Sequence, residues 1–247
     1  MELIPVAGAG LDAAEAEVWW VAVDPESTAA AEAGEAVLSA AERERAAAFA
    51  RPVDRALYRV AHVALRVVLG SCLGIPAGEV SFSRAVCPGC GGPHGRPEVV
   101  GGGVDFSLTH ATGAAVIALA RRPVGVDVEQ RAAFAGPAGL EVGGQLHPAE
   151  QAELAVLPVA ERADGLLRCW TRKEAYLKGV GIGIAYGVAE PYVGTGGQPS
   201  APSGWALVDV PSAPGYGTAL ALHLPPDHPE GAPITVHTRE LPASALR

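Results

Sequence analysis

The chain has 247 residues, of which 49% are apolar and 18% are charged, a composition typical of a globular protein and not of a disordered one. Its formal net charge of −9 argues against broad nucleic-acid binding, and its longest nearly apolar run, over 114–120, is too short to cross a bilayer. No basic residue precedes Arg43, so the N-terminus lacks the charged start of a signal peptide, and we expect a cytoplasmic protein with neither a membrane nor a nucleic acid as partner.

The first half of the chain predicts a mixture of strands and helices. Ser39 and Glu42 have the spacing of a capping box, in which each side chain accepts a hydrogen bond from a backbone amide at the start of a helix. A second helix should end at Gly70, because glycine commonly terminates helices. In chain order we expect a strand over 16–23, helices over 39–50 and 53–69, a loop with short strands over 80–100, and strands over 105–108, 114–120 and 124–129.

A group of arginines lies between positions 43 and 66, where the only acidic residues are Glu44 and Asp54. On residue types alone, a solvated helix face with Arg–acid pairs is the simpler interpretation. The alternative is a local basic strip that binds a small polyanion or an acidic partner. The residues in question are Arg43, Arg45, Arg51, Arg55, Arg59 and Arg66.

The four cysteines fall into two kinds. Cys72 and Cys169 lie in apolar helical segments and are expected to be small core residues. Cys87 and Cys90 form a Cys-x-x-Cys motif with His94 close behind. A structural zinc site commonly takes four protein ligands and no second pair exists, so we favour a structural loop without a metal and leave the metal as the alternative. No βαβ pattern surrounds the pair to support a redox role.

Two acidic residues end an apolar strand. Asp127 and Glu129 are two positions apart and therefore share one face of that strand. Ordinary polarity at a strand end would also explain them. In the helical segment 163–179, Trp170, Glu174 and Lys178 follow one another at intervals of four and lie along one edge. The simpler explanation of Glu174 and Lys178 is a surface ion pair on the helix.

Together the three carboxylates form an all-oxygen site of the kind that Mg²⁺ prefers. The chain has only two lysines, Lys173 and Lys178, and both lie beside Glu174, where an ammonium would neutralise phosphate oxygens. Positioned metal and cations of this kind are typical of phosphoryl-type transfer.

The second half of the chain weakly repeats the first. Residues 38–42 resemble 146–150, and residues 57–70 resemble 166–179, at offsets of 108 and 109. Each pair predicts a helix start followed by a long helix closed by glycine, which favours two related lobes. Chance similarity in an alanine-rich chain is the alternative. Further strands are expected near 187–193, 205–210, 218–224 and 234–237.

At this point the chain resembles the Sfp-type 4'-phosphopantetheinyl transferases. The family pattern Gly-x-Asp-x-Glu is met over 125–129, and Trp-x-x-Lys-Glu-Ala-x-x-Lys-x-x-Gly-x-Gly is met at every fixed position over 170–183. A motif of Phe, hydroxyl residues and His occurs at 106–110, and Gly-Arg-Pro occurs at 95–97. The resemblance covers nearly the whole chain and implies an α+β fold of two similar lobes related by a pseudo-twofold axis. We expect an N-terminal lobe over 1–122, a C-terminal lobe over 123–247, and the active site in the cleft between them.

The resemblance also implies the reaction and the residues that carry it. Such enzymes transfer 4'-phosphopantetheine from coenzyme A to a serine of a carrier protein and release adenosine 3',5'-bisphosphate. Asp127, Glu129 and Glu174 would hold Mg²⁺. Glu174 would take the proton of the serine, and Lys178 would stabilise the leaving group. The coenzyme A site would comprise Gly95, Arg96, Pro97, Thr109, His110, Lys173, Lys178 and one or two of Arg45, Arg51 and Arg55.

The expected partners are coenzyme A and an apo acyl or peptidyl carrier protein of a fatty-acid, polyketide or nonribosomal-peptide pathway, with the enzyme as a monomer. Two other interpretations remain open. The same three acids could serve a Mg²⁺-dependent phosphohydrolase acting on a nucleotide-like substrate with water as nucleophile. Alternatively, the chain could be a non-catalytic module that binds coenzyme A or the carrier, although its complete set of acids and lysines argues against this.

Overall fold

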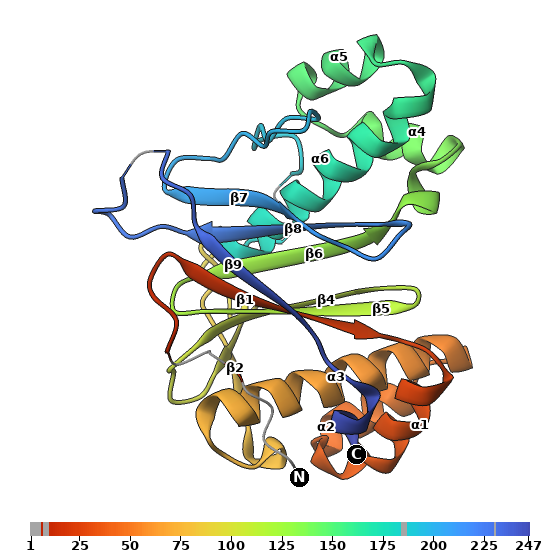
Figure 1. The fold of residues 1–247 in the computed structure, drawn as a ribbon, viewed down its shortest axis with the longest axis vertical. Coiled ribbons are helices and arrows are strands. Elements are labelled where there is room, and N and C mark those ends of the chain that lie inside the picture. The colour runs from red at the N-terminus through yellow and green to blue at the C-terminus, as the bar shows by residue number, and fades with distance from the viewer. Residues whose placement is uncertain (1–5, 7–9, 184–186, 230) are drawn as a thin grey trace.

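The computed structural model describes residues 6, 10–183, 187–229 and 231–247 (Figure 1). The described chain is a mixed α+β structure with three sheets, in agreement with the expected α+β class. The helices are α1 Pro25–Ala33, α2 Ala40–Ala47, α3 Pro52–Leu73, α4 Pro137–Gly143, α5 Pro148–Val156 and α6 Val159–Val180. The strands are β1 Glu15–Ala22, β2 Phe82–Arg84, β3 Pro97–Val99, β4 Asp105–Ala111, β5 Ala114–Ala120, β6 Val124–Gln130, β7 Trp205–Val210, β8 Tyr216–His223 and β9 Thr235–Glu240.

The first sheet has the strand order β4-β5-β1-β9, and α3 packs against one of its faces (Figure 1). Trp19 and Val21 of β1 point to this face and join the buried side of α3 in one core. Val18 points to the opposite face, because successive side chains of a strand alternate. Strand β5 is buried along its whole length, which explains its uninterrupted apolar sequence. By length and composition α3 could cross a membrane, but its apolar side belongs to this core.

The second sheet has the order β6-β8-β7 and lies between the first sheet and α6 (Figure 1). Val126 and Val128 of β6 point toward the first sheet and pack with its residues in a second core. Asp127 and Glu129 alternate with them and therefore face the side on which α6 packs. The amide of Val126 donates to Oγ of Ser107 at 3.1 Å, which links β6 to β4. The fold thus places the acidic face of β6 beside both α6 and β4.

Helix α6 approaches β6 unusually closely because two glycines face each other at the contact. A Cβ atom built on Gly125 would lie 1.9 Å from the carbonyl oxygen of Ala175 and 2.5 Å from the amide nitrogen of Gly179. These are backbone atoms, which no side-chain rotation can move away. The glycine of the Gly-x-Asp-x-Glu pattern is therefore required by the approach of α6 to the strand that carries the acids.

We expect Gly125→Ala to lower the free energy of unfolding by about 3 kcal/mol, at the upper end of the usual cost of overpacking. Chemical denaturation measures this change. The matched control is Gly197→Ala, because a Cβ atom there would have no atom within 4 Å. Equal stabilities for the two variants would contradict the argument.

Most elements expected from the sequence are confirmed, with three corrections. The capping boxes at Ser39–Glu42 and at His147–Glu150 both form and begin α2 and α5. Residues 187–193 are not a strand, and the amide of Val193 instead donates to Glu150 at 2.8 Å. Helices α1 and α4 were not expected, although Asp24 caps α1 with Ser27 and a proline begins it.

The third correction concerns the two glycines expected to end the long helices. Helix α3 continues past Gly70 and is capped by Gly74, while α6 continues past Gly179 and is capped by Gly181, both caps being left-handed. A Cβ atom on Gly70 would lie 2.9 Å from the carbonyl oxygen of Ile75, and one on Gly179 would lie 2.6 Å from the ring of Trp205. Close packing, and not termination, explains glycine at positions 70 and 179.

The end of the chain returns to the first sheet. Strand β9 pairs in parallel with β1, so residues 235–240 lie at the edge of a sheet otherwise formed by residues before 121. The following turn, Ala243–Leu246, packs on α1 and α3 (Figure 1). Leu246 is fully buried there. The division into lobes 1–122 and 123–247 stays a prediction, and the structure adds that the last residues pack with the first lobe.

Candidate active site

A large cavity of about 820 Å³ lies beside the acidic face of β6. It is lined from α3, β4, β6, α6 and the segment between β2 and β3. The sequence-predicted residues in its wall are Gly95, Arg96, Pro97, Thr109, His110, Asp127, Glu129, Glu174 and Lys178. Residues from four separate motifs of the sequence therefore meet in one cavity.

Two of the three carboxylates in this wall have little access to water, and the third, Glu129, is half-buried. Asp127 is 3% exposed and Glu174 is 6% exposed. Oδ2 of Asp127 and Oε1 of Glu174 are buried and lack a hydrogen-bond partner among the residues that the structure describes. Buried oxygens without partners carry a free-energy cost that a bound cation would remove. The all-oxygen donor set and these two unpartnered oxygens fit a hard divalent ion such as Mg²⁺.

The carboxylates do not close into a compact cluster by themselves. Among the described residues, one group of three metal-ligand side chains has its ligand atoms within 4.8 Å of one another, and it consists of Cys87, Cys90 and His94. The three acids do not meet this distance. Like charges repel, which keeps carboxylates apart when no cation or proton lies between them. We expect a bound divalent ion to draw the three carboxylates together.

Lys178 neutralises the most deeply buried of the acids. Its Nζ lies 2.5 Å from Oδ1 of Asp127 and 3.0 Å from Oγ1 of Thr109. The hydroxyl of Thr109 also donates to the same Asp127 oxygen at 2.9 Å. The simpler explanation of Lys178, an ion pair with Glu174 on the helix surface, is therefore wrong, because its partner comes from β6. Lys178 remains 31% exposed, so its ammonium is accessible from the cavity.

Burial raises the pKa of Glu129 to about 7 and that of Glu174 to about 7, and the charge of Asp127 adds to both shifts. Burial also raises the pKa of Asp127, while Lys178 and Thr109 oppose that shift. The cause is common to all three residues: the fold holds several acids together in one poorly hydrated wall. Carboxyls with pKa values near neutrality are typical of functional sites.

These pKa values predict how the metal-free protein responds to pH. The native pKa values of Glu129 and Glu174 exceed the ordinary value of 4.5, so the folded chain keeps protons that the unfolded chain has released. Their stabilising contribution is complete below about pH 4.5 and is lost as the pH rises through about 7. Glu42, whose pKa is lowered to about 2, titrates below this window, whereas His110, whose pKa is lowered from 6.5, opposes the trend of the two glutamates in the lower part of the window.

We therefore expect the Tm of the metal-free protein to fall as the pH rises from about 5 to about 8. Thermal melting in the presence of a chelator measures it. Glu174→Gln should weaken the fall, because one of the titrating groups is removed. A variant profile that falls as steeply as that of the wild type would contradict the assignment.

The cavity wall also contains groups suited to a phosphorylated ligand. His110 lines it, and its pKa is lowered, first by burial and then by the nearby His62 and Lys178. Arg96 lines it as well and is already paired with Asp105 at 2.9 Å and with Glu98 at 3.3 Å. Gly95 lies against a neighbouring strand end, where a Cβ atom would be 2.6 Å from the carbonyl oxygen of Ala85.

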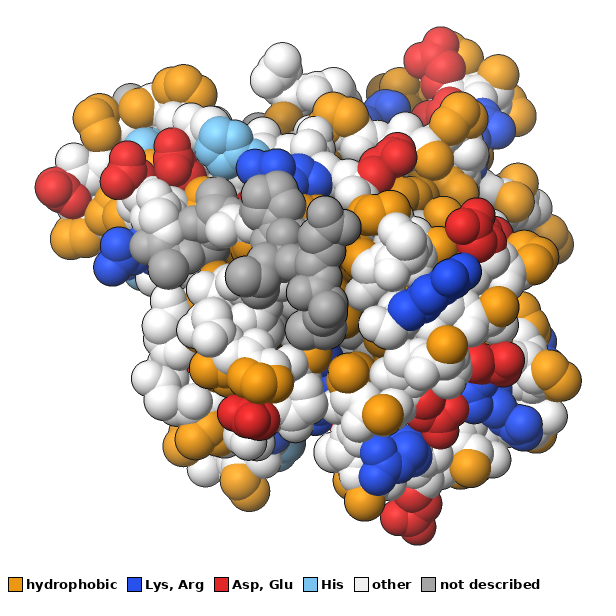
Figure 2. Space-filling model, turned by 60° about the horizontal axis from the view of Figure 1, so that its bottom comes forward, with side chains coloured by type: hydrophobic (Ala, Val, Ile, Leu, Met, Phe, Trp, Pro, Cys, Tyr) orange, Lys and Arg blue, Asp and Glu red, His pale blue; other side chains and the backbone are white. Residues whose placement is uncertain are grey.

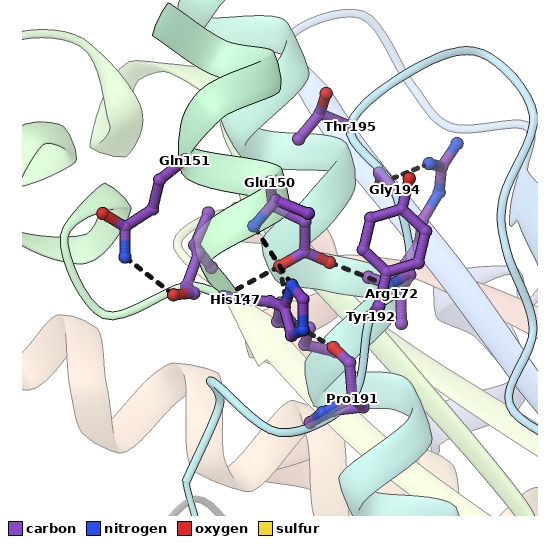
Figure 3. Close-up of polar contacts among 12 residues, drawn as sticks. His147, Glu150, Gln151, Arg172, Pro191, Tyr192, Gly194 and Thr195 are labelled. Carbon is purple, nitrogen blue, oxygen red and sulfur yellow. Dashed lines mark hydrogen bonds and ion pairs between the residues drawn. The ribbon is translucent and has the colours of Figure 1, made fainter.

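Lys173 lies elsewhere. Its side chain is fully buried in an ion pair with the fully buried Glu150, at 2.7 Å, and it also donates to the carbonyl of Pro191. Glu150 in turn accepts from the amide of His147 (Figure 3) and from the amide of Val193. Arg172 donates to the carbonyl of Gly194 and to the carboxylate of Asp209. Lys173 is not among the residues that line the cavity, so its predicted contact with substrate gains no support from this geometry.

The three candidate arginines also lie outside the cavity wall. Arg51 is exposed and pairs with Asp54 at 2.7 Å, beside a different cavity. Arg55 donates to the carbonyl of Phe49, and the guanidinium of Arg45 lies 5.4 Å from the ring of Phe49. Their contact with a phosphate stays a prediction.

Three of the six arginines, Arg51, Arg59 and Arg66, pair with acids, as the simpler interpretation expects, although Arg66 is buried and not on a solvated face. Arg59 contacts Glu32 and Glu35, and Arg66 contacts Glu42 at 2.8 Å. On the face shown in Figure 2, basic and acidic side chains are interspersed and no large patch of one sign is seen.

Sequence reasoning missed other residues of the wall, among them Glu42, His62 and Arg84. His62 stacks on Tyr58 at 4.0 Å between ring centroids, and its Nδ1 lies 3.5 Å from Glu42. A signal was present, because Tyr58, His62 and Arg66 follow one another at intervals of four in a helical segment whose one other polar residue is Arg59.

Comparison with known proteins adds independent findings. The family model described as the 4'-phosphopantetheinyl transferase superfamily matches residues 123–199, which include the three acids and Lys178. The chain is 33% identical over 178 residues to 4'-phosphopantetheinyl transferase HetI of Nostoc sp., a match that covers 69% of this chain and 70% of that protein. It is 28% identical over 159 residues to slr0495 of Synechocystis sp., whose name assigns it provisionally to the same activity; 62% of this chain and 61% of that protein are covered.

Proposed function

Because the chain belongs to the 4'-phosphopantetheinyl transferase superfamily, we propose that it transfers 4'-phosphopantetheine from coenzyme A to a serine of an apo acyl or peptidyl carrier protein. Adenosine 3',5'-bisphosphate is the second product, and the reaction requires Mg²⁺. The main observation behind the proposal is that one cavity is lined by all of these groups: the three carboxylates, the accessible Lys178, His110 and residues 95–97.

In the proposed reaction, Oγ of the carrier serine attacks the phosphorus that bears the pantetheine arm. The bond from that phosphorus to the bridging oxygen of the pyrophosphate breaks, and this oxygen leaves with the nucleotide. Mg²⁺ bound by Asp127, Glu129 and Glu174 would neutralise charge on the pyrophosphate oxygens.

The chain's own residues supply the remaining steps. Glu174 accepts the serine proton, directly or through a water, since its carboxylate lines the cavity. Lys178 lies beside Asp127 with its ammonium accessible from the cavity, and it stabilises the negative charge on the leaving oxygen. His110 and Thr109 meet the 3'-phosphate side of coenzyme A, and Arg96 meets its nucleotide end.

We also propose the two-lobed arrangement, with lobes 1–122 and 123–247 and the active site in the cleft between them. Corresponding contacts in the two halves support it. In the first half, the capping-box residue Glu42 of α2 pairs with Arg66 of the long helix that follows, α3. In the second half, the capping-box residue Glu150 of α5 pairs with Lys173 of the long helix that follows, α6. Both long helices, α3 and α6, have 22 residues and end at a left-handed glycine.

The proposal is tested by incubating the protein with coenzyme A, Mg²⁺ and a panel of apo carriers from fatty-acid, polyketide and nonribosomal-peptide pathways. Mass spectrometry of the carriers should show the gain of one phosphopantetheine on a serine. Coenzyme A consumed without any modified carrier would support the phosphohydrolase instead, and coenzyme A bound but not consumed would support a non-catalytic module.

We also propose that the protein is a monomer and that it is cytoplasmic. Gel filtration tests the monomeric state, and cell fractionation tests the location.

The role of His110 gives a separate prediction. We expect His110→Ala to raise the KM for coenzyme A by about ten-fold or more, because a hydrogen bond to a charged group contributes about 1.5–3 kcal/mol. The KM for dephospho-coenzyme A, which lacks the 3'-phosphate, should change much less. The control is His228→Ala, whose side chain lies in a loop away from the cavity wall. Equal effects of His110→Ala on both substrates would contradict a role at the 3'-phosphate.

A further inference from the structure

A second group of metal-ligand side chains lies in the loop between β2 and β3. Cys87, Cys90 and His94 each offer a ligand atom, and these atoms all lie within 4.8 Å of one another. Sγ of Cys90 is 2.9 Å from Nε2 of His94. Two sulfurs and an imidazole nitrogen form a donor set that selects zinc over magnesium.

The backbone of this loop is already folded around the two sulfurs. The amide of Gly91 donates to the carbonyl of Cys87 at 2.8 Å, and the amide of Cys87 donates to the carbonyl of Gly92 at 2.7 Å. Gly91 has a φ of +74°, which favours glycine and lets the chain turn back after Cys90. The amide of Gly92 also points to Sγ of Cys90, at 3.4 Å, where it would stabilise a thiolate.

The elements on either side of the loop are short. Strands β2 and β3 have three residues each and, among the described residues, form a two-stranded sheet that packs on the first core through Phe82 and Val99. The loop nevertheless ends in Gly95 and Arg96, which line the active-site cavity. Arg84 at the end of β2 donates to the carbonyl of Gly95, so the hairpin positions this part of the wall.

We propose that Cys87, Cys90 and His94 bind one Zn²⁺, which fastens the β2–β3 loop and holds Arg96 in the cavity wall. Cys87 is buried while Cys90 and His94 are exposed, so the fourth coordination position faces solvent and is filled by water. This site is separate from the three carboxylates and its existence does not depend on the transferase reaction.

The metal content of the full-length protein, purified under reducing conditions and passed through a desalting column, tests the proposal. Elemental analysis should find about one zinc per chain in the wild type, and Co²⁺ substitution should give the charge-transfer absorbance of thiolate ligands. Cys90→Ser should lose both signals. Cys72→Ser is the matched control and should keep them, and Glu174→Gln should also keep them, which separates this site from the magnesium site.

A second measurement uses only the wild type, so the proposal can still be tested if the Cys90→Ser variant does not fold. Bound zinc should protect Cys87 and Cys90 from alkylation, and a chelator should expose Cys90 and increase proteolytic cleavage of the 85–97 segment, while the alkylation of Cys72 changes little. Wild-type protein that binds neither zinc nor cobalt with its thiols reduced would overturn the proposal. Stoichiometric zinc in a folded Cys90→Ser variant, or a Cys87–Cys90 disulfide in freshly isolated protein, would overturn it too.

Discussion

Replacing Glu174 by glutamine is expected to lower kcat for phosphopantetheinyl transfer by about 10²–10³-fold, the usual cost of removing one preorganised group that stabilises transition-state charge. Glutamine keeps the shape of the side chain and one oxygen but loses the charge that would hold Mg²⁺ and accept the serine proton. Steady-state transfer to the best apo carrier, measured at saturating coenzyme A and Mg²⁺, gives kcat directly.

The same substitution should stabilise the metal-free protein. Glu174 shares a buried wall with Asp127 and Glu129, and above about pH 7 the like charges repel one another. Removing one charge should therefore raise the Tm at about pH 8 in the presence of a chelator. Added Mg²⁺ should raise the Tm of the wild type and should raise that of Glu174→Gln much less, since only the wild type keeps all three acids.

Glu161→Gln is the matched control for both measurements, because Glu161 lies in the exposed first turn of the same helix. Its kcat and its response to Mg²⁺ should follow those of the wild type. If Glu174→Gln retained full activity, the assignment of the acids would be wrong; if it lost activity while Mg²⁺ stabilised it as strongly as the wild type, Glu174 would be a base and not a metal ligand.

Replacing Lys173 by methionine is expected to lower the free energy of unfolding by about 3–5 kcal/mol, the typical cost of breaking a buried ion pair by removing one partner. Lys173 and Glu150 are both 0% exposed, so the remaining carboxylate would be buried without its cation. Methionine has a similar length and fills the same space, which limits any cavity. Chemical denaturation measures the loss.

The double variant Lys173→Met with Glu150→Gln separates charge from packing. It leaves no unpaired buried charge and should recover part of the stability lost in the single variant. A double variant less stable than Lys173→Met would show that Glu150 is held mainly by the amides of His147 and Val193.

The Lys173 variant also tests the predicted contact with coenzyme A. If Lys173 acts only within the fold, the KM for coenzyme A, measured well below the Tm, should change little. A large rise in KM with intact folding would establish the contact that the sequence motif implied.

Much of the site was predictable because it follows from local periodicity. The alternation of side chains in a strand placed Asp127 and Glu129 on one face, and the structure puts both in the cavity wall. Helical spacing placed Trp170, Glu174 and Lys178 on one edge, and all three line the same cavity. The sequence also predicted the capping box at Ser39–Glu42, a helix start near 146–150 and the strands that carry these residues.

The sequence by itself determined which side chains share a face, whereas only the tertiary structure decided what packs against that face. Five residues turn a helix by about 140°, so Lys173 and Lys178 point to different sides, where one meets Glu150 and the other meets Asp127 of β6. The sequence could not show that position 125 must be glycine, because that depends on how closely α6 packs on β6. Nor could it show that β9 pairs with β1, which lies more than 200 residues earlier in the chain. Periodicity is a property of neighbours along the backbone, but contacts between distant segments depend on how whole elements pack their buried surfaces together.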